Sequence, residues 1–186
     1  MYIILGLILV TIIYLVTFYN GLKTAQVQIQ ASIQEIGNQL KRQVDLIPNL
    51  VDSVKGYMKH EKEIFKDLTD ARKLVESAKT GDPKSVDKAQ ASINNVLKSL
   101  NVIVESNPEI KASNLVSDLM GELRDTADKI MYARRTLIDL SADFNVKIST
   151  IPGMWIAPMM GFTTQPGFST PTSGDFLSVS EAETKN

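Results

Sequence analysis

The side chains that most often catalyse reactions or bind metals are scarce in this chain. It has one histidine, His60, and no cysteine in 186 residues. Thiolate metal sites are therefore excluded, and a Ser-His-Asp triad would depend on His60 alone. Carboxylate metal sites in helical bundles pair Glu with a Glu-x-x-His motif, but position 57 is Tyr57. We expect no metal site, no cofactor and no catalytic residue.

Motif and charge patterns also argue against the common functional classes. The sequence contains no Gly-rich phosphate loop, no HExxH and no GxSxG. Its 20 basic and 21 acidic residues give a net charge of −1, so bulk electrostatics does not favour nucleic acid. The sequence predicts a protein that is not an enzyme and that has no nucleic-acid partner.

The remaining candidates are interaction or structural residues. They comprise two basic pairs, a segment around a proline and a single tryptophan: Lys41, Arg42, Asp45, Pro48, Asn49, Arg134, Arg135 and Trp155. Each has a structural reading beside a binding one. Asn49 follows Pro48 and could cap or bond a backbone broken there, which we favour over ligand binding. His60 lies between charged neighbours and reads as a surface histidine.

The two basic pairs allow different partners. Lys41 and Arg42 could touch lipid headgroups, but a helix leaving a membrane would place them roughly 27 Å out, beyond a Debye length. A solvated helix face is the favoured reading there. Arg134 and Arg135 could clamp an acidic partner, or could pair with carboxylates of their own bundle such as Glu122. Both readings remain open for this second pair.

An apolar N-terminal stretch predicts a membrane anchor. Residues 1–22 carry no charge, and residues 2–19 would span roughly 27 Å as a helix, close to a bilayer's hydrocarbon thickness. Tyr2 and Tyr19 bracket the run, as interfacial aromatics do. A cleaved signal peptide is the alternative, but no basic residue precedes the run and residues 19–22 make a poor cleavage site. We expect an uncleaved anchor over residues 1–19.

The anchor predicts a single-pass protein of the cell membrane, with the lipid bilayer as its partner. Lys23 is the basic residue nearest to the apolar run, and the short N-terminal side has none. The positive-inside rule therefore favours a cytoplasmic main domain.

Apolar residues at spacings of three and four predict helices throughout residues 20–151. Helix boundaries are indicated at Gly81-Asp82-Pro83, at Asn107-Pro108 and at Ile151-Pro152-Gly153. Pro48 interrupts the first stripe, and proline disfavours helix at the preceding residue.

The segment lengths bear on what Pro48 does. If Pro48 only kinked the helix, residues 24–79 would extend about 84 Å beside partners of about 36 and 55 Å. A break at Pro48 gives four segments of more similar length, which can close as a bundle. The sequence therefore predicts an all-α fold, with an N-terminal transmembrane helix followed by an antiparallel up-and-down four-helix bundle. Three helices, one of them bent, remain the alternative.

The C-terminal part divides into two segments. Residues 152–162 are an apolar Met/Trp segment, too short and too interrupted by proline to span a membrane. Residues 163–186 are rich in Ser, Thr, Gly and Pro, and predict a disordered tail. In the four-helix order the last helix returns to the membrane, so Trp155 would lie at the bilayer surface. In the three-helix order it would lie some 50 Å away.

Two sets of residues form recognisable signatures. The first is Leu40-Lys41-Arg42 with residues 45–51, continued by Lys55-Gly56-Tyr57, His60-Glu61-Lys62 and Ala71-Arg72. The second is Glu122-Leu123, Thr126, Ile130, Ala133-Arg134-Arg135, Phe144-Asn145 and Pro152. With these signatures the chain resembles the LemA family of membrane proteins over about residues 19–162. The chain departs from the family pattern at Ile33, Gly37, Ala127-Asp128-Lys129 and Leu137-Ile138. The resemblance implies an N-terminal membrane helix, a four-helix bundle and a cytoplasmic main domain, and it implies no catalytic residues.

These expectations leave two functional hypotheses. The first is a membrane-anchored, non-catalytic scaffold or adaptor whose bundle binds another protein or itself. The second is a binding module that holds a peptide or lipid ligand in a groove between helices, through the Met-rich segment near Met159.

Overall fold

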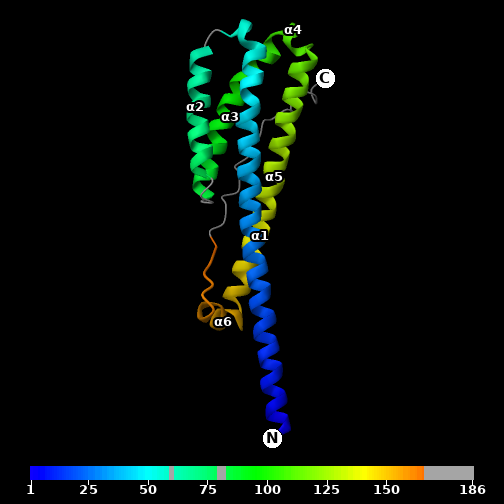
Figure 1. The fold of residues 1–186 in the computed structure, drawn as a ribbon, viewed down its shortest axis with the longest axis vertical. Coiled ribbons are helices and arrows are strands. Elements are labelled where there is room, and N and C mark those ends of the chain that lie inside the picture. Colours follow the sequence, from blue (N-terminus) through cyan, green and yellow to red (C-terminus); the bar gives the residue numbers. More distant parts are fainter. Residues whose placement is uncertain (59–60, 79–82, 166–186) are drawn as a thin grey trace, which may run out of the picture.

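The computed structural model describes residues 1–58, 61–78 and 83–165, and every regular element in those ranges is helical (Figure 1). In chain order the elements are α1 (Tyr2–Val54), the short 3-10 helix η1 (Lys55–Tyr57), α2 (Glu61–Ala78), α3 (Pro83–Ser106), α4 (Pro108–Lys111), α5 (Asn114–Ser149) and α6 (Gly153–Met159).

Four helices follow an up-and-down order. In Figure 1, α1 runs the length of the molecule, the chain reverses after η1, and α2 and α3 form a hairpin beside the distal half of α1. α5 then returns along α1, with which it makes the most extensive helix pair, and α6 packs against α5. The all-α class and the four-helix order are therefore confirmed.

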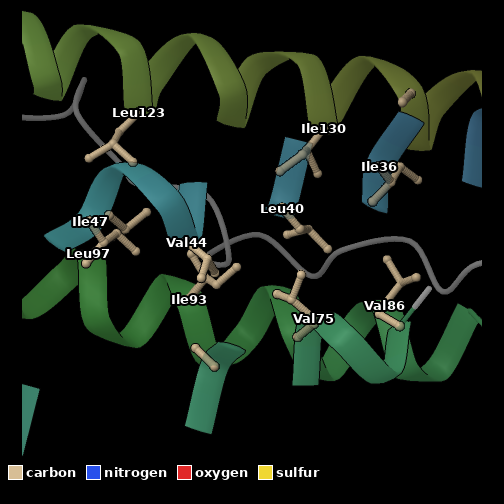
Figure 2. Packing of buried hydrophobic residues seen from close by; sticks show 14 of the residues in the cluster. Ile36, Leu40, Val44, Ile47, Val75, Val86, Ile93, Leu97, Leu123 and Ile130 are labelled. Carbon is tan, nitrogen blue, oxygen red and sulfur yellow. The ribbon is translucent and has the colours of Figure 1, made fainter. Parts of the chain in front are cut away.

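The core lies where α1 meets the other three long helices. Figure 2 shows Leu40, Val44 and Ile47 of α1 between side chains of α5 and of the α2–α3 hairpin. Leu40 and Ile47 are fully buried, and so is Ile93 of α3. Burying one such side chain contributes about 1.5–3 kcal/mol, so the apolar stripe of α1 contributes strongly to bundle stability.

The expected chain break at Pro48 is wrong. Pro48 lies inside α1, which continues to Val54, and the reversal comes after η1. A proline inside a helix costs about 3 kcal/mol or more, because it removes a hydrogen bond and crowds the carbonyl four residues earlier. Ile47, Leu50 and Val54 flank it with 0% exposure, and their burial outweighs that cost. The bent three-helix alternative is also wrong, because the helix does not continue into α2.

Two other predicted boundaries are observed. α3 begins at Pro83, and α4 begins at Pro108 directly after Asn107. Asn107 does not cap α4 with its side chain. Its Nδ2 instead donates to the carbonyl oxygen of Ile103 at 2.7 Å, which closes the end of α3. Gly81 and Asp82 lie outside the described residues.

The C-terminal segment folds back on the bundle. α5 ends at Ser149, as expected near Ile151-Pro152-Gly153, and the apolar segment 152–162 contains α6. Ile151 is 68% exposed and so does not extend the buried stripe of α5. Of the predicted disordered tail, residues 163–165 are described and the rest lie outside the described residues.

The N-terminal part of α1 protrudes from the bundle (Figure 1). It is long and apolar enough to cross a membrane, and its most apolar window has no buried residue. The hydroxyls of Thr11 and Thr17 donate to the carbonyl oxygens of Leu7 and Ile13 at 2.9 and 2.8 Å. These two threonine hydroxyls are therefore satisfied within their own helix, which suits a lipid environment.

Candidate functional site

Arg134 is a buried cation in the middle of α5. Its side chain is 9% exposed, and its guanidinium donates to the carboxylate of Asp87 and to Oε1 of Gln90, both on α3. A buried charge is tolerated only when it is paired and hydrogen-bonded, and α3 supplies both partners. Of the two readings left open for this pair, Arg134 shows the pairing with a bundle carboxylate, but with Asp87 rather than Glu122. The next residue, Arg135, is exposed, so the two arginines do not form one clamp.

Glu122 instead belongs to the seam between α1 and α5. Its Oε2 accepts from Nη2 of Arg42 at 3.2 Å, with both side chains about half exposed. One residue along each helix, Nε2 of the buried Gln43 points at the carbonyl oxygen of Leu123 at 3.5 Å. The exposed pair adds little stability because water screens it.

The other candidates on α1 lie on its solvent side. Lys41, Asp45 and Asn49 are exposed, and Pro48 is half-buried. Asn49 does not cap a broken helix, because the helix is not broken there. Its backbone carbonyl accepts from the hydroxyl of Ser53 at 2.7 Å, an ordinary bond within a helix. These four residues form no site with one another.

A third cluster lies where α6 meets α1. Gly153, the first residue of α6, sits so close to α5 that a Cβ there would collide with the carbonyl oxygen of Lys147 and would lie 3.2 Å from the ring of Phe18. The ring of Phe162 lies 5.5 Å from that of Tyr19 and 6.2 Å from that of Phe144. Aromatic pairs at these distances are stabilising, so the segment is held on both long helices.

The chain beyond α6 is held by a side-chain amide. Nδ2 of Asn145 donates to the carbonyl oxygen of Gln165 at 2.9 Å, and the backbone N–H of Gln165 donates to Oδ1 of Asn145 at 2.8 Å. Asn145 thus both donates to and accepts from the backbone of Gln165, as a residue of an adjacent β-strand would. This contact fixes where the chain leaves the described part of the molecule.

Trp155 lies on the opposite side of α6 from these contacts. Gly153 and Ala157 are buried, whereas Trp155 is 60% exposed and Met159 is 89% exposed. The segment therefore has one face packed on the bundle and one apolar face that the described protein does not cover.

These clusters are suited to holding helices together rather than to chemistry. The cations Arg42 and Arg134 are each paired with a carboxylate of another helix. Among the described residues, no group of three or more His, Cys, Asp or Glu side chains is placed to hold a metal ion. His60 lies outside the described residues.

A sequence model of the LemA family matches residues 32–179, which is well over half of the chain. The chain belongs to the LemA family. Its helical fold and exposed apolar helix make it a membrane-associated LemA protein.

One curated relative is the magnetosome protein MamQ of Magnetospirillum gryphiswaldense. It is 25% identical over 181 residues, an alignment that covers 84% of this chain and 66% of MamQ. This LemA chain therefore spans a little under two thirds of that relative's length.

The LemA signature segments of α1 and α5 pack on each other. Arg42 belongs to the first segment and pairs with Glu122 of the second, and Gln43, the next residue after Arg42, donates to Leu123 of the second. Sequence reasoning did not single out Gln43 or Asp87 as contact residues. Gln43 lies directly before Val44 within the apolar stripe, and that position indicates that its side chain is buried. Asp87 carries no comparable signal, because its role depends on how α3 docks against α5.

Proposed function

We propose that this LemA protein is a membrane-anchored, non-catalytic scaffold or adaptor. The observation that carries the proposal is the continuity of α1, which passes from the apolar run into the core of the bundle without a hinge. A helix packed over several turns moves with the core, so the bundle is held in a defined position relative to the bilayer. Such rigid placement suits a protein that presents a surface to a partner.

The pairing of charged groups supports the non-catalytic part of the proposal. Catalytic groups usually converge on a concave, partly dry site with a proton donor or acceptor beside a reacting atom. Here the buried cation Arg134 contacts Asp87 and Gln90 of a neighbouring helix. This arrangement supports a structural role for the charged residues of the core.

The side of α5 that faces away from the core offers a surface for a protein partner. Tyr132 is 76% exposed and Met131 is 45% exposed, and Arg135 is exposed one turn along. Tyr, Met and Arg are enriched in protein interfaces. We define this as the Tyr132 surface.

Site-specific photo-crosslinking in cells tests the scaffold proposal. A photoreactive side chain at Tyr132 should give a discrete adduct of defined mass, either with one membrane-associated protein or with a second copy of the chain. The same group at Val102 of α3, which is 61% exposed, is the matched control and should give none. The same adducts from both positions, or none from Tyr132, would contradict the proposal.

The anchoring part of the proposal has its own test. The full chain should stay with membranes after carbonate extraction, because residues 2–19 remain attached as a span. Recovery of a soluble form that starts near residue 20 would show that the run is a cleaved signal peptide.

We also propose that the bundle faces the cytoplasm. The chain has no cysteine, so a single cysteine at the exposed Lys98 can be labelled without background. An impermeant maleimide should label it in broken cells but not in intact cells. Labelling in intact cells would place the bundle on the other side.

The alternative of a ligand-binding groove has less support. It relied on the Met-rich segment near Met159, and that residue points away from the bundle, being 89% exposed. The inner face of the segment is already occupied, because Ala157 and Phe162 are buried. The exposed face is therefore better suited to a lipid surface than to a ligand held between helices.

A further inference from the structure

The exposed face of α6 lies next to the end of the membrane span. It is formed by Met154, Trp155 and Met159 of the helix together with Ile151 just before it, with exposures of 47%, 60%, 89% and 68%. We call it the α6 apolar face. Such a concentration of large apolar side chains on one short segment marks an interaction site.

The packing of α6 sets its depth along α1. Gly153 faces the ring of Phe18, and Phe162 contacts the ring of Tyr19. Phe18 and Tyr19 are the last residues of the apolar run that is long enough to cross a bilayer. α6 is therefore held at the level where the hydrocarbon core ends, and Figure 1 shows the free part of α1 continuing beyond it.

The charges at this end of the molecule suit a membrane surface. Residues 1–34 and 144–165 contain no Asp or Glu, and their charged side chains are Lys23 and Lys147. Both lysines are exposed. Lysine can bury its stem and keep its ammonium at the level of the headgroups, and these two described ranges contribute no carboxylate that would repel anionic lipid.

We propose that the α6 apolar face is a second membrane contact, seated in the interfacial layer of the bilayer that α1 crosses. Trp155 lies among the headgroups and the upper acyl chains, where tryptophan is enriched. Met154 and Met159 enter the same layer beside it. The protein then contacts the bilayer through two elements, the apolar run of α1 and the α6 apolar face.

Continuity with the span favours lipid over other occupants. The rings of Phe18 and Tyr19, which contact the α6 segment, are also the last residues of the apolar run. A bilayer that surrounds the run therefore reaches α6 without any rearrangement of the protein. A second copy of the chain, or another protein, would have to displace lipid from a surface already at lipid depth.

Trp155 is the only tryptophan, so its fluorescence reports this face alone. The full chain is reconstituted in phosphatidylcholine–phosphatidylglycerol vesicles whose acyl chains carry bromine at a shallow or a deep position. Trp155 should lose much of its emission, more with shallow bromine than with deep bromine. An emission loss no greater than that of a water-exposed tryptophan would overturn the proposal.

Two variants provide the comparison, each in a W155F background. V102W places the reporter on an exposed part of α3 far from the span, and it should not be quenched. Y14W places it inside the apolar run, and deep bromine should quench it strongly. This inference rests on the membrane anchoring of the proposed function. Absence of quenching in Y14W would reject the anchoring itself. Quenching in Y14W but not at Trp155 would reject only the membrane contact of the α6 apolar face.

A charge on the α6 apolar face provides an independent test. Met159→Asp alters a side chain that is 89% exposed, so the packing of the bundle should not change. The substitution should reduce the quenching of Trp155, whereas Met159→Leu should preserve it. Equal quenching in the two variants would contradict lipid contact by this face.

Dilution separates lipid from a second copy. The quenching of Trp155 should persist when the protein is diluted among excess lipid. Quenching that is lost on dilution would mean that neighbouring copies bring the residue to the bilayer, and it would overturn the proposal in favour of self-association.

Discussion

Replacing Pro48 by alanine should stabilise the protein. Proline disfavours a helix interior by about 3 kcal/mol relative to alanine, through the lost hydrogen bond and the crowded carbonyl. Two effects oppose the gain. The unfolded chain becomes freer, which costs about 0.4–1 kcal/mol, and part of a half-buried ring is removed, which costs on the order of 1 kcal/mol. The free energy of unfolding should therefore rise by about 1–2 kcal/mol.

The assay is thermal unfolding of the full chain in detergent micelles, followed by far-ultraviolet circular dichroism. For a chain of this size, each kcal/mol shifts Tm by about 2–4 °C, so Pro48→Ala should raise Tm by about 2–8 °C. Pro108→Ala is the matched control. Pro108 is the first residue of α4, where a backbone N–H would lack a helical partner anyway, so its replacement should give no gain.

A fall in Tm for Pro48→Ala would refute the reasoning. It would mean that α1 needs the local geometry that proline imposes, or that the ring packs better than its half-buried state indicates. A similar rise for both variants would also refute it, because the gain would not then come from the helix interior.

Three further comparisons have equally defined outcomes, the first two in the same unfolding assay and the third by limited proteolysis. Leu40→Ala should lower the free energy of unfolding by about 2–5 kcal/mol, because the side chain is fully buried, whereas the exposed neighbour Lys41→Ala should change it by less than about 0.5 kcal/mol. Gly153→Ala should destabilise by about 1–3 kcal/mol because its Cβ has no room, whereas Gly121→Ala, in open space on α5, should stabilise by about 0.5–1 kcal/mol. Asn145→Ala removes both hydrogen bonds to the chain beyond α6, so limited proteolysis should cleave after residue 163 faster than in the parent protein. Equal effects within either pair, or an unchanged cleavage rate, would show that the assigned contact does not act as described.

The helices could be predicted from the sequence because their apolar residues recur at spacings that only a helix brings to one face. The four-helix order followed from lengths and from the boundaries at Pro83 and Pro108. The reversal point did not. The rule that proline breaks helices is local, and the burial of Ile47 and Leu50 on both sides of Pro48 is a tertiary effect that the rule does not include.

The contacts between helices were harder to predict. Arg134 lies four residues after Ile130 and three before Leu137, so the spacing shows that it is buried. Its partner Asp87 is 47 residues away in sequence, and only the docking of α3 brings the two together. The helical state of α6 was missed for a related reason, because a segment of seven residues with an internal proline shows no period of its own.

The uninterrupted course of α1 has a mechanical consequence. Transmembrane helices tilt when the bilayer is thinner than their apolar length, and a tilt of about 20° is the average. The part of α1 beyond the apolar run, from about residue 20 to Val54, is a lever of about 52 Å. A tilt of about 20° would therefore carry its distal end about 18 Å sideways over the membrane. The same tilt lowers that end toward the lipid surface by about 3 Å. Energy transfer from a dye at the exposed Gly56 to labelled lipid, in vesicles of graded acyl length, should therefore rise slightly as the bilayer becomes thinner. Transfer that does not change with thickness would show that bundle and bilayer are mechanically uncoupled.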